Sequence, residues 1–223
     1  MEVIKYFRQV LKNLHCISNI DIQTLLIKKT LKRIPKKKSW KIKDKLKEDF
    51  FEISAKYSVA NILKGGSTTF CSVTSMAMKE YSDQIKQNWE LIKETQKIGL
   101  RGYFANNFQD YCTFYKNDKK IYVYDKHEGE EGLERAENFS VEIKKLKDRK
   151  IKTFLFPYTL ENCSDQLLKH TKELAEDLGI NIRMHAAQYK DDFQRNFILS
   201  NKDPLNRLDS LGLIVNNTCN LSI

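Results

Sequence analysis

Strand-like and helix-like segments alternate along most of this chain, at a spacing of roughly 30 residues, and this alternation restricts the possible folds more than any other feature. Apolar residues recur at helical spacing in some segments, and short runs of β-branched and aromatic residues separate them. The predicted strands are 67–73, 100–105, 151–156, 180–184 and 213–215, and the predicted helices are 46–63, 82–98, 130–149, 164–178, 190–199 and 204–211. Residues 119–124 are predicted as a short hairpin or excursion.

Because parallel strands need long crossover connections, usually helices, the pattern predicts an α/β protein with parallel strands. A doubly wound sheet and a TIM barrel both fit it.

Positive charge is concentrated at the start of the chain. The 223 residues carry a net charge of +10, and nearly all of this excess lies in residues 1–50. The segment 28–47 is especially basic, with Asp44 its single acidic residue. We therefore predict two parts, a basic and partly helical N-terminal segment over 1–42 and an α/β domain over 43–223.

The sequence predicts a cytoplasmic protein. It has no apolar run long enough for a transmembrane helix, and Arg8 and Lys12 interrupt the first apolar stretch, which excludes a signal peptide. The five cysteines are odd in number and form no CxxC pair, which favours reduced thiols.

Parallel α/β proteins place their sites at the carboxyl ends of strands, so the residues that follow the predicted strands are the candidate functional side chains. Asn106 and Gln109 follow the strand at 100–105, and His185 follows the strand at 180–184. A neutral imidazole at such a position is a common ligand of transition metals. A structural histidine remains the competing interpretation, because the sequence contains no HExxH motif and no closely spaced cysteines.

Four stretches of the chain resemble the amidohydrolase superfamily, in its cytosine-deaminase and chlorohydrolase-like branch. Residues 157–213 include CSDQLLKH, ELAEDLG and IRMHAAQ, which resemble the fourth and fifth barrel strands of that branch and lead into a downstream "P…L…LGL" stretch. Upstream, LKGGSTTFCSV is similar to its second strand, and IGLRGYFANNFQD to its third. The resemblance covers about residues 45–223.

This resemblance implies a partial TIM (β/α) barrel of a metal-dependent hydrolase. The implied reaction is hydrolysis of a non-peptide carbon–nitrogen bond in a small cyclic or amide substrate, with one divalent transition metal, zinc or iron. His185 corresponds to the family's metal ligand on strand five. Gln188 stands where many relatives have a glutamate that moves protons, and a glutamine cannot exchange a proton near neutral pH.

The chain also departs from the family pattern. It contains no His-x-His pair, and it matches barrel units two to six only. We therefore expect a fragment that is inactive or weakly active alone, and whose open sheet edges favour self-association.

Two other functions remain open on the sequence. One is a non-catalytic α/β module whose basic segment 28–47 binds nucleic acid or an anionic membrane. Nucleic acid is the less favoured partner, because Trp40 is nearly alone as an aromatic residue among the lysines. The other is a complete α/β enzyme of another family, with Asn106, Gln109 and His185 lining a pocket.

Overall fold

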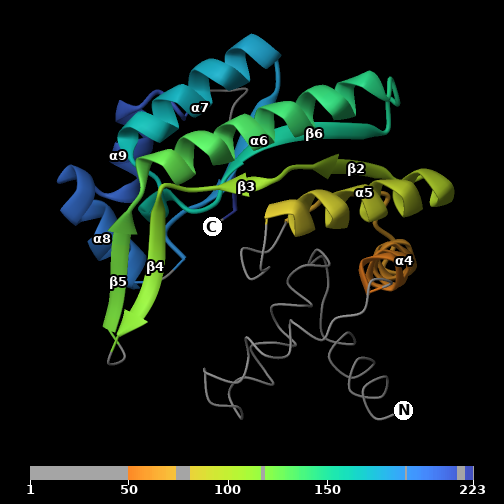
Figure 1. The fold of residues 1–223 in the computed structure, drawn as a ribbon, viewed down its shortest axis with the longest axis horizontal. Helices are drawn as coiled ribbons and strands as arrows, with labels where there is room; N and C mark the ends of the chain where they lie inside the picture. The colour runs from red at the N-terminus through yellow and green to blue at the C-terminus, as the bar shows by residue number, and fades with distance from the viewer. Residues whose placement is uncertain (1–49, 74–80, 117–118, 189, 215–218, 223) are drawn as a thin grey trace. The chain divides into compact units, whose positions relative to one another are not determined.

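The computed structural model describes residues 50–73, 81–116, 119–188, 190–214 and 219–222 (Figure 1). The basic segment 28–47 and the predicted boundary between residues 42 and 43 lie outside these ranges. The elements, in order, are α4 (Phe50–Lys64), β1 (Thr69–Cys71), α5 (Tyr81–Ile98), β2 (Arg101–Phe104), β3 (Asn107–Phe108), β4 (Tyr111–Lys116), β5 (Lys119–Tyr124), α6 (Lys126–Lys145), β6 (Ile151–Pro157), the 3-10 helix η1 (Leu160–Asn162), α7 (Asp165–Leu178), β7 (Asn181–His185), α8 (Lys190–Ser200), α9 (Pro204–Ser210) and β8 (Cys219–Ser222). The chain divides into two compact units, with the main boundary after Phe104.

The first unit contains α4, β1, α5 and β2, together with residues 148–152. β1 and β2 are parallel, with Phe70 opposite Gly102. The amide of Gly102 donates to the carbonyl of Lys150 at 2.9 Å, so the chain entering β6 lies beside β2. The hydroxyl of Ser72 donates to Asn88 on α5 at 3.0 Å, which fastens the end of β1 to the helix that follows it.

The second unit contains β3, the rest of β6, β7 and β8, with α6 to α9. β6 pairs in parallel with β3 on one side and with β7 on the other, and β7 pairs in parallel with β8. The predicted parallel α/β class is therefore confirmed. The hairpin of β4 and β5 is antiparallel and is larger than predicted, because its first strand was not recognised.

One face of the sheet in the second unit carries the core. Leu155 on β6 and Ile182 and Met184 on β7 belong to a single buried cluster. It also includes Ala136, Leu160, Leu167, Leu168, Ala175, Leu208 and Leu211. Helices α6 and α7 lie along β6 (Figure 1), and α7 contributes much of this cluster. The strand periodicity of two leaves the alternate side chains, such as Phe156 and His185, on the other face.

Capping residues explain where the helices begin and end. Ser164 accepts a hydrogen bond from the amide of Leu167, and Gly179 adopts a left-handed φ of 59° at the end of α7, as predicted for this helix. The predicted start of α6 at Glu130 was wrong. Asp125 caps the helix by accepting from the amide of Glu128 at 3.1 Å, so it begins four residues earlier, at Lys126.

The predicted strand at 213–215 was also wrong over its described part. Leu213 donates its amide to the carbonyl of Leu208 at 3.0 Å and therefore still belongs to the turn that closes α9. The strand of this region is β8, which starts at Cys219 and pairs with β7.

The close contact of α6 with β3 at Gly132 yields a first prediction. A Cβ atom at this glycine would lie 2.6 Å from the Cβ atom of Phe108. We expect Gly132→Ala to lower the free energy of unfolding by about 1–3 kcal/mol, since overpacking outweighs the better helix propensity of alanine. Urea titration measures the change, and Glu134→Ala on the exposed face of α6 is the control, expected within ~0.5 kcal/mol of wild type. A Gly132→Ala chain as stable as the control would contradict the tight approach.

Candidate functional site

The carboxyl ends of β3, β6 and β7 meet at one edge of the sheet in the second unit. Phe108 pairs with Pro157 at the ends of β3 and β6. The chain then continues past β6, where Thr159 forms a parallel bridge with His185 at the end of β7. The parallel register therefore brings residues that are far apart in the sequence to the edge where α/β proteins place their sites.

His185 lies half-buried at this edge, against aromatic rings. Its ring centre is 5.5 Å from that of Phe156 and 6.0 Å from that of Tyr158, both in edge-to-face geometry. Its amide donates to the carbonyl of Tyr158 at 3.2 Å. Burial, and to a smaller extent the positive charge of Arg183, lowers the pKa of His185 from 6.5 to about 4. The imidazole is therefore neutral at neutral pH, which is the state that can bind a metal ion.

Arg183 lies two residues before His185, on the same face of β7. Its guanidinium stacks 5.9 Å from the ring centre of Phe154 and 5.7 Å from that of Phe156. The face of the sheet that carries His185 is thus built from aromatic rings and one cation.

Gln188 is exposed in the loop that leaves β7. Between it and His185 lie Ala186, which is buried, and Ala187, which has a left-handed φ of 55°. The structure thus places both predicted site residues in one short loop at the carboxyl edge, His185 packed and Gln188 open to solvent.

Asn106 and Gln109 are both buried near the same edge. The amide oxygen of Gln109 accepts from Asn162 at 3.0 Å. The side-chain amide of Gln109 therefore takes part in a hydrogen bond within the protein, which weakens the prediction that it lines a pocket with His185.

The donors near His185 do not form a metal site among the described residues. In residues 50–73, 81–116, 119–188, 190–214 and 219–222 no three His, Cys, Asp or Glu side chains are grouped so that they could hold a metal ion. A zinc site in a protein generally needs three or four such ligands. The described residues therefore offer no complete set of metal ligands around His185, and the implied metal does not fit them alone.

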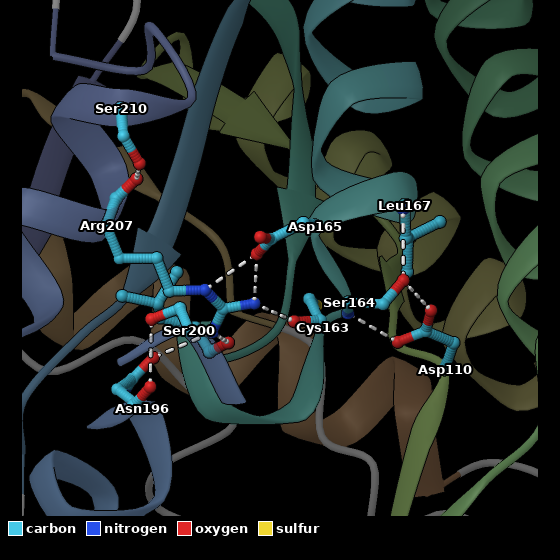
Figure 2. A network of polar contacts seen from close by, with 10 residues as sticks. Asp110, Cys163, Ser164, Asp165, Leu167, Asn196, Ser200, Arg207 and Ser210 are labelled. Atoms are coloured by element: carbon cyan, nitrogen blue, oxygen red, sulfur yellow. Dashed lines mark hydrogen bonds and ion pairs between the residues drawn. The ribbon is translucent and has the colours of Figure 1, made fainter. Parts of the chain in front are cut away.

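A buried polar network beside this edge was not foreseen from the sequence (Figure 2). At one end, the carboxylate of Asp110 accepts the amide of Ser164 at 2.8 Å and also its hydroxyl. Burial raises the pKa of Asp110, and these hydrogen bonds from Ser164 act in the opposite direction. At the other end, Arg207 binds residues of α7, α8 and η1. The sequence around Arg207 gave no local signal of this role, because polar residues such as Asn206 and Asp209 lie beside it on the same helix.

Comparisons with known proteins show which proteins this chain is similar to. No family model matches it. It is 24% identical over 177 residues to a 5-methylthioadenosine/S-adenosylhomocysteine deaminase of Halothermothrix orenii, and the match spans 79% of this chain but 35% of the relative. Among solved structures it is similar to guanine deaminase of C. acetobutylicum with bound guanine, with a TM-score of 0.62, 16% identity and coverage of 86% of this chain and 42% of that one.

A mutant atrazine chlorohydrolase of Arthrobacter aurescens, complexed with zinc and atraton, is also similar. Its TM-score is 0.60 at 15% identity, with coverage of 88% of this chain and 41% of that one. The curated relatives that match this chain in sequence are deaminases, and the similar solved structures, a guanine deaminase and an atrazine chlorohydrolase, share its fold. The predicted resemblance is confirmed, and with it a partial amidohydrolase barrel as the fold. The chain spans about 35% of the length of the curated relative, so a relative's activity does not transfer to it directly.

None of the helices in the described ranges combines the length and hydropathy that a membrane crossing requires.

The environment of His185 predicts a dependence of stability on pH. Since its pKa is lower in the folded chain than in the unfolded chain, the unfolded chain takes up a proton first as the pH falls. The contribution of His185 to the free energy of unfolding should therefore be present above about pH 6.5 and should be lost as the pH falls toward 4.

Urea titrations of wild type and His185→Asn at pH 7 and pH 5, with a chelator present, measure this contribution. We expect the difference in the free energy of unfolding between wild type and His185→Asn to shrink or vanish at pH 5, compared with pH 7. His170→Asn, at an exposed position of α7, is the matched control. An unchanged difference between wild type and His185→Asn at the two pH values would show that the imidazole does not titrate as its burial implies.

Proposed function

We propose that this chain forms part of the barrel of a metal-dependent hydrolase that acts on a non-peptide carbon–nitrogen bond of a small cyclic or amide substrate. The observation that carries the proposal is the neutral imidazole of His185 at the carboxyl end of β7. The proposal is also supported by the similarity of this chain to deaminases in sequence, and to a deaminase and a chlorohydrolase in structure. The names of these proteins describe small-molecule substrates.

In this proposal His185 is a ligand of one divalent transition metal, zinc or iron. Two similar structures, those of an adenosine deaminase of Xanthomonas campestris and of the atrazine chlorohydrolase, contain bound zinc. Because the described residues hold no group of three donors, the proposal requires further ligands from outside them. The described part alone is therefore inactive or weakly active, and its open sheet edges favour self-association.

Gln188 faces the substrate in this proposal. Its exposed amide can donate to and accept from a ring nitrogen or carbonyl of a substrate. It cannot exchange a proton near neutral pH, so proton transfer during deamination is not its role.

We also place the protein in the cytoplasm, where thiols stay reduced. Cys71, Cys112 and Cys163 are all free thiols in the structure.

Metal binding tests the role of His185. Zinc titrated calorimetrically into the metal-free chain should bind weakly, and His185→Ala should weaken the binding further, since removing the imidazole removes one ligand. His127→Ala, at an exposed position of α6, is the control and should bind zinc as wild type does. Equal zinc binding by wild type and His185→Ala would remove the assignment of His185.

Ammonia release tests the role of Gln188. The substrates are S-adenosylhomocysteine, 5-methylthioadenosine and guanine, which the names of similar proteins supply. With zinc or ferrous iron added, we expect the wild-type rate to lie near background. Gln188→Glu should raise it by about tenfold or more, because a carboxylate can transfer the proton that an amide cannot.

Gln166→Glu adds the same charge at an exposed position of α7 and should leave the rate unchanged. Equal rates for Gln188→Glu and Gln166→Glu would contradict the placement of Gln188 against the substrate.

A further inference from the structure

Arg207 is a fully buried arginine on α9, with 1% of its surface exposed. Its guanidinium donates four hydrogen bonds and also forms an ion pair. Nε donates to the carboxylate of Asp165 at 2.8 Å, and Nη2 lies 2.8 Å from the same carboxylate oxygen as an ion pair. Nη1 donates to the carbonyl of Leu160 at 2.9 Å and to the side-chain oxygen of Asn196 at 2.8 Å, and Nη2 donates to the carbonyl of Cys163 at 2.7 Å.

These acceptors lie in separate elements (Figure 2). Leu160 and Cys163 belong to the segment that follows β6, Asp165 begins α7, and Asn196 is buried within α8. The arginine itself is held on a helix whose first turn is fixed by Asp203, which accepts the amides of Leu205 and Asn206. One rigid guanidinium therefore joins α9 to the segment that follows β6, to the start of α7 and to α8.

The segment over residues 158–164 connects Arg207 to the candidate site. At its start, the amide of Tyr158 donates to the carbonyl of Phe108 at 2.9 Å, and the carbonyl of Tyr158 accepts the amide of His185 at 3.2 Å. At its end, Ser164 donates to Asp110. The same short segment thus contacts the end of β3 and the end of β7, while the carbonyls of Leu160 and Cys163 bind Arg207.

We propose that Arg207 is a positioning residue: its four hydrogen bonds and its ion pair with Asp165 hold segment 158–164 and α8 in place, and so fix the backbone around His185. This inference rests on the proposed function only in taking the His185 edge as the site. The geometric claim stands on the hydrogen bonds alone.

The physical reason lies in the cost of leaving these acceptors without donors. Without the guanidinium, the carbonyls of Leu160 and Cys163 and the side-chain oxygen of Asn196 lose their donor inside a dry core. The segment must then shift to find water or other donors. A lysine cannot substitute, because a single ammonium group cannot reach acceptors arranged around a planar fork.

Arg135 on α6 provides a matched comparison. It pairs with Glu128 at 3.0 Å and with Glu131 at 3.4 Å, but all three side chains are partly exposed on one helix. Pairs of this kind contribute little, because water replaces the lost partner. Removing Arg135 therefore deletes an arginine of the same unit without disturbing segment 158–164.

Amide hydrogen exchange in the native chain tests the proposal without requiring catalysis. In Arg207→Met and Arg207→Lys, we expect the amides of Tyr158 and His185 to exchange about tenfold faster or more, as in a local opening. The amide of Ile182, inside β7, should keep its wild-type rate, and Arg135→Met should leave all three amides unchanged. Reaction of His185 with diethyl pyrocarbonate, followed by mass spectrometry, should accelerate in the same two Arg207 variants.

Several outcomes would overturn the proposal. Equal acceleration at Tyr158, His185 and Ile182 would show that Arg207 contributes to global stability alone. Wild-type exchange in Arg207→Lys would show that the planar fork is unnecessary, and this variant decides the question if Arg207→Met does not fold. Because neither measurement uses substrate or metal, a failed deaminase assay would leave this result intact, and the reverse also holds.

Discussion

The parallel pairing of β6 with both β3 and β7 is the constraint on which the second unit depends. It places the carboxyl ends of the strands at one edge, and it sends one face of β6 and β7 into the apolar cluster beneath α6 and α7. The opposite face carries Phe154 and Phe156 beside Arg183 and His185. The imidazole of His185 therefore lies beside aromatic rings and near the positive charge of Arg183, and these neighbours set the chemistry available at the edge.

Polar contacts hold the loops that follow these strands, together with the apolar packing of Leu160, Cys163 and Ala186. Asp110 binds the start of α7 through Ser164, and Arg207 binds the segment just before it through backbone carbonyls. Asp110 and Arg207 are both buried, so each must satisfy its hydrogen bonds within the protein. Hydrogen-bonded networks of this kind favour a single loop conformation, which a site at the edge of a sheet requires.

Much of the fold was predictable because its signals are local. Apolar periodicity indicated the helices, and Ser164 and Gly179 marked the ends of α7 by side-chain capping and a left-handed turn. Several features escaped prediction, among them a short strand and a turn. The strand β3 has only two residues, too few for any period, and Leu213 looked like a strand residue although its amide closes the turn after α9.

The sequence by itself determined the α/β class, the likeness to amidohydrolases and the position of His185 at a strand end, because each depends on residues close together in the chain. Only the tertiary structure decided the state of that imidazole, since the rings of Phe156 and Tyr158 come from the neighbouring strand and its continuation. It alone also showed the role of Arg207, whose acceptor at Leu160 lies 47 residues away in the chain. Burial and long-range hydrogen bonds depend on which elements pack together, and local sequence patterns do not record that.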